Sequence, residues 1–274
     1  MSSTSPENLS KADSARCAEP SIVENIIDLL EPKAEGTYLD LACETGNYTV
    51  ALAGKGGKWA AVDNSSRMLG LAKGKSGSID WKLAEVQSLP FEDETFDGIV
   101  CTLGMQYFQN VMEVGKEIGR VLKKDAPLVI FTSTPEQMGN FWLNHYFPMM
   151  MADTIIRMPA LATVASALNK GGMSIRIRRA YDIQPDHQDG FLYCGKHKPE
   201  RYMDSKVRDS IPAFRDLVED YELEDGLERM KADIQSGSLE QIRNSYNRGG
   251  GDYMFIKAEK TGVVVEEPEA APLD

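Results

Sequence analysis

The sequence predicts an α/β domain built on a mostly parallel sheet, and three observations carry this prediction. In the first half of the chain, short apolar stretches typical of strands alternate with amphipathic helical stretches, and the connections between them are short. The fifth expected strand is almost continuously apolar, as in a strand covered on both faces. With 274 residues, of which 42% are hydrophobic, the chain can form one elaborated domain.

The elements of this half follow in order. The expected helices are Glu19–Leu30, Asn47–Ala53, Ser66–Lys73 and Val111–Leu122, and the expected strands are Thr37–Ala42, Lys58–Val62, Asp80–Leu83, Phe96–Thr102 and Pro127–Ser133. Apolar residues of the first helix recur at a spacing of three and four, and Pro32 ends it. Ser65 is expected to cap the third helix.

After Ser133 the alternation stops. A helix is expected at 159–169, a strand at Met173–Tyr181 and a last strand at Asp252–Ala258. The segments 134–157, rich in Met and aromatic residues, and 183–250 are interpreted as insertions that form a helical cap on one domain spanning 19–260. The polar ends, 1–18 and 261–274, are expected to be disordered because they contain too little apolar surface to fold.

Composition narrows the functional classes. A formal net charge of −12 disfavours nucleic acid as a partner, because phosphate binding needs a basic surface. The four cysteines are far apart, which predicts neither a metal site nor a disulfide framework and fits a reducing cytoplasm. We find no apolar run of 18 residues and no signal core, so we expect no membrane segment. A small molecule is the expected partner, and the oligomeric state is not predicted.

The strongest local pattern is a strand, the turn ACETG and a helix. Asp40 ends the strand, and the backbone N–H groups of the turn and the helix start can point at a polar ligand. The next strand ends at Asp63, whose carboxylate can accept both hydroxyls of a ribose. Together the two strand ends predict a crevice for a nucleoside.

The residues of the turn select among nucleoside cofactors. A dinucleotide site needs GxGxxG, but here Ala42 and Glu44 occupy small-residue positions and only Gly46 remains. A carboxylate at Glu44 would repel a pyrophosphate but would tolerate the ammonium and sulfonium of S-adenosylmethionine. A nicotinamide-dependent dehydrogenase is therefore disfavoured.

Four segments resemble a known family. LDLACETGNYT, AVDNSSRML, LAEVQSLPFEDETFDGIVC and EIGRVLKKDAPLVIFT are similar, in consecutive order over about residues 20–135, to class I S-adenosylmethionine-dependent methyltransferases of the ubiquinone- and menaquinone-biosynthesis type. The resemblance implies a Rossmann-like, doubly wound sheet of seven strands with an antiparallel last strand. It also implies S-adenosyl-L-methionine as the cofactor.

The same resemblance assigns cofactor contacts. It places Asp40 and Gly46 at the methionine end, Asp63 at the ribose, Met68, Glu85 and Val86 near the adenine, and Thr102 and Leu103 on the methyl-transfer face; Ala42, Glu44 and Asn64 in the same motifs complete the set. The family usually has glycines where Ala42 and Glu44 stand, and Asp in place of Glu85.

Methyl transfer is an in-line displacement, which requires a base only when the nucleophile is protonated. The expected catalytic residues are Tyr107, His145 and His187, and His197 and Asp153 are further candidates. The apolar segment around 141–151 is interpreted as cap core or as the wall of a hydrophobic pocket. The predicted function is methyl transfer to a small, partly apolar acceptor. The alternative, which Glu44 keeps open, is a protein that binds S-adenosylmethionine or S-adenosylhomocysteine without transferring the methyl group.

Overall fold

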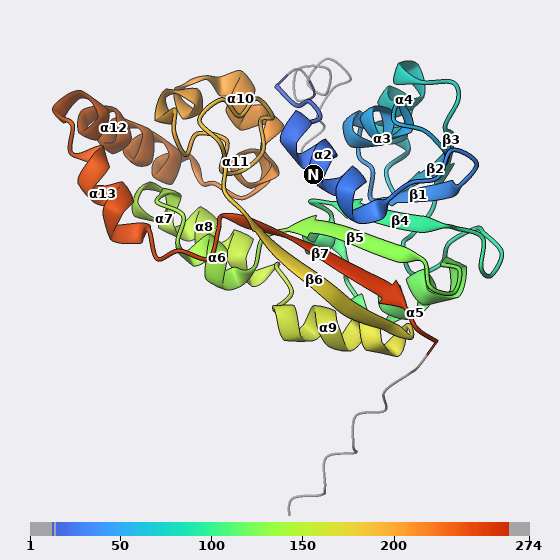
Figure 1. Cartoon of the computed structure of the whole chain (residues 1–274). Helices are drawn as coiled ribbons and strands as arrows, with labels where there is room; N and C mark the ends of the chain where they lie inside the picture. Colours follow the sequence, from blue (N-terminus) through green and yellow to red (C-terminus); the bar gives the residue numbers. More distant parts are fainter. Residues whose placement is uncertain (1–12, 14, 263–274) are drawn as a thin grey trace, which may run out of the picture.

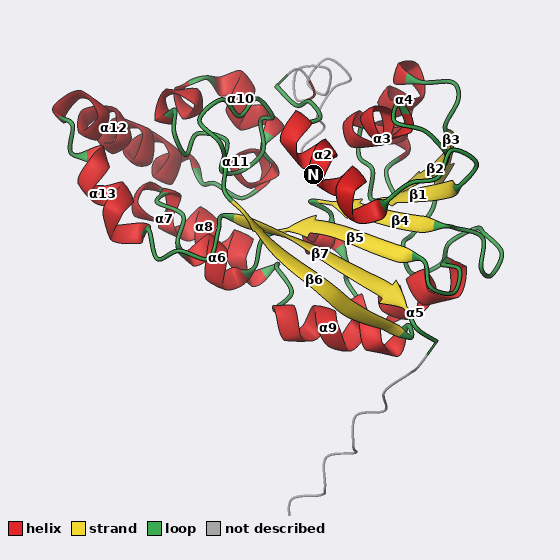
Figure 2. Ribbon diagram, viewed as in Figure 1, coloured by secondary structure: helices red, strands yellow, loops and turns green. Residues whose placement is uncertain are grey.

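A seven-stranded sheet forms the centre of the computed structural model, which describes Asp13 and residues 15–262 (Figures 1 and 2). Its strand order is β3-β2-β1-β4-β5-β7-β6. The strands are β1 (Thr37–Leu41), β2 (Lys58–Asp63), β3 (Asp80–Leu83), β4 (Gly98–Thr102), β5 (Pro127–Thr132), β6 (Met173–Tyr181) and β7 (Tyr253–Lys260). The first five pair in parallel, and β7 runs antiparallel to both β5 and β6. The predicted fold class, with an antiparallel last strand, is confirmed.

The strand order reverses direction at β1. From β1 the chain builds outward to β2 and β3, and then returns to place β4 on the other side of β1. In open α/β sheets ligands bind at such a reversal, outside the carboxyl ends of the strands. The carboxyl ends of β1, β2 and β4 therefore define the place to search for a site.

Helices cover both faces of the sheet (Figure 2). On one face lie α2 (Pro20–Leu30), α3 (Asn47–Ala53) and α4 (Ser66–Lys75), and on the other α5 (Val111–Val121) packs against α9 (Leu161–Lys170). The predicted cap of α4 is present, because the Ser65 hydroxyl accepts the backbone N–H of Met68 at 3.3 Å.

The element ends differ from the predictions by a few residues. β4 begins at Gly98 because Phe96 makes only an isolated bridge to Leu122. β7 extends to Lys260 because it pairs with β6 as far as Met173.

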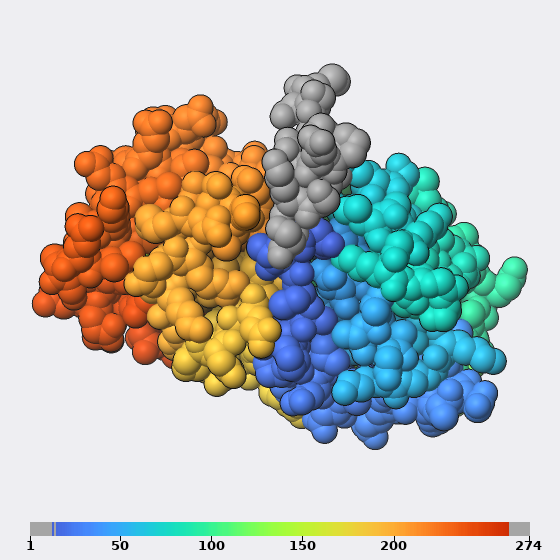
Figure 3. All heavy atoms as spheres, turned by 90° about the horizontal axis from the view of Figure 1, so that it is seen from above, coloured from blue at the N-terminus to red at the C-terminus, as the bar shows by residue number. Residues whose placement is uncertain are grey.

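The segments after β5 and after β6 form a helical cap at one end of the sheet (Figures 1 and 3). The cap consists of α6 (Pro135–Gly139), α7 (Leu143–Tyr146), α8 (Pro148–Ile156), the 3-10 helix η2 (Pro199–Met203), α10 (Ser205–Ser210), α11 (Pro212–Asp216), α12 (Asp220–Ser236) and α13 (Leu239–Tyr246). The two segments interlock, since α7 contacts α12 and α8 contacts α11.

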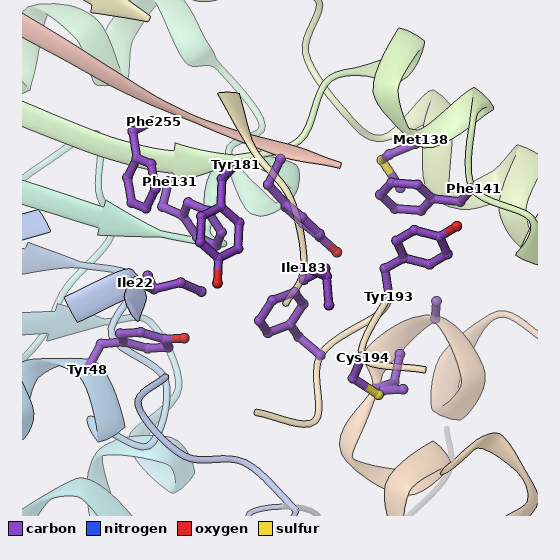
Figure 4. Close-up of a cluster of buried hydrophobic side chains, with 14 of the residues drawn as sticks. Ile22, Tyr48, Phe131, Met138, Phe141, Tyr181, Ile183, Tyr193, Cys194 and Phe255 are labelled. Carbon is purple, nitrogen blue, oxygen red and sulfur yellow. The ribbon is translucent and has the colours of Figure 1, made fainter. Parts of the chain in front are cut away.

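A continuous aromatic core joins this cap to the sheet (Figure 4). Phe131 of β5 lies 4.6 Å, centroid to centroid, from Phe255 of β7. Farther into the cap, Phe141 stacks on Tyr193 at 4.0 Å, and Tyr253 contacts both Phe131 and Phe141. Because one core runs through both parts, the cap is fixed against the sheet. The apolar segment around 141–151 is mainly core.

The ends of the chain bear on two further predictions. Arg16 and Cys17 both bond to Asp189, so the folded part begins before the predicted residue 19. The rest of the predicted disordered N-terminus, residues 1–12 and 14, and the tail from 263 lie outside the described residues.

One stretch matches a membrane span in length and composition. Pro148–Lys170 is long and apolar enough by these criteria alone. In the structure it consists of two helices, α8 and α9, interrupted between Ile156 and Leu161, and α9 packs against α5 of the domain.

The close contact of α5 with α9 gives a first prediction. A Cβ added at Gly115 would overlap the carbonyl oxygen of Ala167, whereas one at Gly70 in α4 would meet open space. We expect Gly115→Ala to lower the free energy of unfolding by about 1–3 kcal/mol. The same change at Gly70 should raise it by up to about 1 kcal/mol, because alanine favours a helix. Urea denaturation measures both, and equal effects at the two positions would contradict the packing described here.

Candidate functional site

Three cavities meet at the carboxyl ends of β1, β2 and β4. The turn after β1 shapes them with unusual backbone conformations: φ is 56° at Ala42 and 49° at Glu44, and Leu103 after β4 also has φ of 56°. Non-glycine residues in the left-handed region are strained, and such residues concentrate at functional sites. The glycine-like path of the predicted motif is therefore retained although two of its glycines are replaced.

The first cavity, of about 20 Å³, lies between the turn and the start of α3. Its walls are Arg16, Asp40, Ala42, Cys43, Glu44, Thr45, Asn47, Tyr48 and Thr102. The buried Asp40 carboxylate accepts the Thr49 hydroxyl at 2.6 Å, and burial raises the pKa of Asp40 to about 7. The Thr102 hydroxyl is buried without a hydrogen-bond partner in the described part of the chain. Both groups suit a polar, cationic ligand end.

The second cavity, of about 170 Å³, lies beside the end of β2. It is lined by Ala42, Glu44, Asp63, Asn64, Ser65, Met68, Glu85, Val86, Tyr107, Phe108 and Arg215. The Asp63 carboxylate accepts the backbone N–H groups of Glu44 and Ser65, each at 2.9 Å. Burial raises the pKa of Asp63, and these two N–H groups oppose that effect. Each carboxylate oxygen can accept further, so Asp63 can hold two hydroxyls of a ribose.

The third cavity, of about 120 Å³, opens between the sheet and the cap. Its wall is mostly apolar, from Leu103, Met138, Met158, Phe191, Leu192, Ile211, Pro212, Ala213, Leu217 and Tyr253, with Arg16, Glu44, Gln106, Tyr107, Thr132, Ser133, Thr154, Arg157 and Asp216 as polar members. Glu44 lines all three cavities, and Tyr107 lines the second and third.

Arg16 is a member of the site that sequence reasoning missed. Its Nε lies 2.7 Å from Asp189 Oδ1 and its Nη1 lies 3.3 Å from Glu44 Oε2. The side chain is only 14% exposed and lines the first and third cavities. No local pattern marks this residue, because its carboxylate partner Asp189 lies 173 residues away in sequence.

Gly46 has a different place from the other predicted cofactor contacts. It lines none of the cavities described above, and it begins α3 with φ of 76°. A Cβ there would overlap the ring of Trp81. Gly46 therefore shapes the turn and lets α3 pack closely, while ten other predicted residues line the cavities: Asp40, Ala42, Glu44, Asp63, Asn64, Met68, Glu85, Val86, Thr102 and Leu103.

The two histidines predicted as catalytic lie elsewhere. His145, in α7, packs edge-on against Tyr146, with ring centroids 4.9 Å apart. His187 is 4% exposed beside Glu19, and burial lowers its pKa. Neither lines the three cavities, so the structure does not bring them to the site; of the predicted catalytic residues only Tyr107 is there. The further candidates His197 and Asp153 are likewise absent from these walls.

Comparison with known proteins fits this geometry. A family profile described as a methyltransferase domain matches residues 39–130, the segment from β1 to β5. Over 120 residues the chain is 32% identical to a demethylmenaquinone methyltransferase of Bacillus mycoides (strain KBAB4). The segment from β1 to β5 is therefore similar to a methyltransferase domain. The match covers 40% of this chain and 51% of the relative, so the chain spans about half the length of the curated relative.

Solved structures extend this similarity into the cap. A protein of Anabaena variabilis, assigned as a methyltransferase of an antibiotic biosynthesis pathway, superposes with a TM-score of 0.79 at 26% identity and covers 89% of this chain and 98% of its own. A second similar structure is the geranyl diphosphate C-methyltransferase of Streptomyces coelicolor A3(2), solved with Mg²⁺, geranyl diphosphate and S-adenosyl-L-homocysteine. It superposes with a TM-score of 0.57 at 12% identity, and the match covers 88% of this chain and 78% of that chain. At that identity the second likeness shows the fold alone.

The buried Asp40 gives a second prediction. The pKa of Asp40 is about 7 in the folded protein, above that of an exposed Asp. As pH rises, Asp40 therefore loses its proton at a lower pH in the unfolded chain than in the folded protein. Stability contributed by protonated Asp40 is thus present at low pH and lost as pH rises toward 7. Relative to Asp40→Asn, we expect the ligand-free wild type to lose about 2 kcal/mol of unfolding free energy between pH 5 and pH 7. Urea titrations at both pH values test this, and parallel pH dependence in the two proteins would contradict it.

Proposed function

We propose that this protein transfers a methyl group from S-adenosylmethionine to a small, partly apolar acceptor. One observation supports this most directly: the second cavity, with Asp63 on its wall, and the mostly apolar third cavity under the cap share Glu44 and Tyr107 as common walls. A cofactor in the second cavity and an acceptor in the third cavity would meet at these shared walls.

The residues of the two polar cavities fit this cofactor. Asp63 would hold the ribose hydroxyls, and Glu85 and Val86 would lie at the adenine edge. Asp40 and the unpartnered Thr102 hydroxyl would face the methionine end. When bound, S-adenosylmethionine supplies an electrophilic methyl group on a sulfonium. Its positive charge favours the ionised form of Asp40.

The cap would bind the acceptor and exclude water. Met138, Phe191 and Leu217 give the third cavity an apolar wall that favours an apolar body by burial. The side-chain donors Thr132, Ser133 and Thr154 donate to backbone carbonyls, so they are occupied. The protein's role is then to hold the nucleophile in line with the methyl carbon.

Glu44 favours a second candidate, a protein that binds S-adenosylmethionine without transferring its methyl group. A carboxylate stands where the family usually has glycine, and it lines every cavity of the site. The two candidates differ in whether label from [methyl-³H]-S-adenosylmethionine appears in an acceptor.

We also propose a cytoplasmic location and a small-molecule partner. The four cysteines are all free thiols, as expected for a protein that works in a reducing compartment.

A third prediction concerns Asp63. In calorimetry with S-adenosylhomocysteine, Asp63→Asn should weaken binding on the order of 100-fold, because two hydrogen bonds to a charged acceptor become weaker. Asp80→Asn, at the far end of the neighbouring strand β3 and mostly exposed, is the matched control and should bind like wild type.

Circular dichroism checks that both variants fold. Unchanged affinity in Asp63→Asn would exclude the proposed ribose contact. Tight binding by the wild type with no labelled product from any acceptor would favour the second candidate function.

A further inference from the structure

Glu44 occupies a position that does not favour its side chain. Its φ of 49° is in the left-handed region, where glycine is the residue without steric cost. Glutamate has no special tolerance for this conformation. Glu31 and Glu94 share this conformation away from the cavities, so any contribution of Glu44 to the site comes from where its side chain lies.

The position of Glu44 limits what that contribution can be. It is the one carboxylate among the described residues that lines the acceptor cavity and both cofactor cavities. Leu103 and Tyr107, which follow β4, complete the boundary with the acceptor cavity. A methyl group passing from a cofactor to an acceptor in these cavities would cross this boundary, which the Glu44 side chain lines.

Two arginines lie near Glu44: Arg16 forms an ion pair with it, and Arg215, whose charge interacts with it, lines the second cavity beside it. Arg16 Nη1 lies 3.3 Å from Glu44 Oε2. No hydrogen bond to Oε1 is found within the described residues, and the side chain is 37% exposed. One oxygen is therefore held by Arg16 while the other is available to a ligand. Arg16, itself fixed by Asp189, acts as a positioning residue.

The other ionisable groups on the acceptor cavity do not offer a free base. Asp216 is paired with Arg215 at 2.7 Å. Tyr107 and Tyr253 are phenols, which are neutral near pH 7 and carry no anionic oxygen. The Gln106 amide N–H donates to the carbonyl of Leu103. Glu44 is the carboxylate left to accept a proton at this boundary.

We propose, on the basis of the proposed methyl transfer, that Glu44 is the general base and that the acceptor presents a protonated nucleophile, a hydroxyl or an ammonium. The Glu44 carboxylate removes a proton from the hydroxyl or ammonium, and the electron pair of that O–H or N–H bond stays on the nucleophile. An electron pair of the nucleophile then forms the bond to the methyl carbon, and the methyl–sulfur bond breaks with its pair on sulfur. Neutral thioether, methylated acceptor and protonated Glu44 result, and the proton leaves to water.

The test compares two probes that differ in their need for a base. Phenol must lose a proton during methylation, whereas thiophenol is largely ionised at pH 8 without help. With the full chain and labelled S-adenosylmethionine, Glu44→Gln should lower kcat for phenol by about 10²–10⁴-fold. It should change kcat for thiophenol by less than about threefold, since no proton is removed. Glu113→Gln, an identical change on the exposed face of α5, is the control and should match wild type.

Binding separates this role from a role in holding the cofactor. S-adenosylhomocysteine affinity of Glu44→Gln should stay within about threefold of wild type, a difference below about 1 kcal/mol. Equal losses for phenol and thiophenol, or an unchanged rate with phenol, would overturn the proposal. So would a loss of cofactor affinity as large as the loss of kcat.

If the wild type binds S-adenosylhomocysteine but methylates neither probe, that result counts against the proposed function. A second experiment then still tests whether Glu44 faces the acceptor. In the S-adenosylhomocysteine complex, wild type should then bind benzylamine at least about tenfold more tightly than benzoate, and Glu44→Gln should lose this preference. Equal binding of the two probes by wild type would show that Glu44 does not face the acceptor.

Discussion

The parallel register of β1 with its two neighbours is the constraint on which the site depends. Leu41 is level with Val62 of β2 and with Cys101 of β4, so the three strands end side by side. This alignment brings Asp40, Asp63 and Thr102 to one edge of the sheet although they are far apart in sequence. The hydrogen bond from the Glu44 N–H to Asp63 then ties the turn after β1 to the end of β2.

The cap depends on the same sheet through its aromatic core. Phe131 and Tyr253 lie on adjacent strands, and their rings stack at a centroid distance of 5.4 Å. Tyr253 also contacts Phe141 of the cap and lines the acceptor cavity. A residue of the sheet thus contributes to the wall that selects the acceptor, which links specificity to the packing of the whole core.

Sequence reasoning recovered what is encoded locally. Short apolar stretches and helical periodicity placed the strands and helices, and the turn ACETG together with Asp63 pointed to the strand ends at which the structure has its cavities. The resemblance added the identity of the fold. Contacts between distant segments were not recoverable: Arg16 lies in a polar stretch that reads as disordered, and only the tertiary fold brings it to Asp189 and Glu44. The place of His187, buried beside Glu19 and away from the three cavities, could not be predicted for the same reason, since it depends on how the segment after β6 packs against the start of α2.

The placement of β7 has a consequence for how this protein is made. Strand β7, Tyr253–Lys260, lies between β5 and β6, and neither of those two can complete its pairing until the chain has been synthesised as far as Lys260. The ion pair of Arg16 likewise cannot form until Asp189, 173 residues later in the chain, has been synthesised. A ribosome-bound chain therefore holds β1 to β5 with an open apolar edge for much of its synthesis, a state in which protection from aggregation matters most.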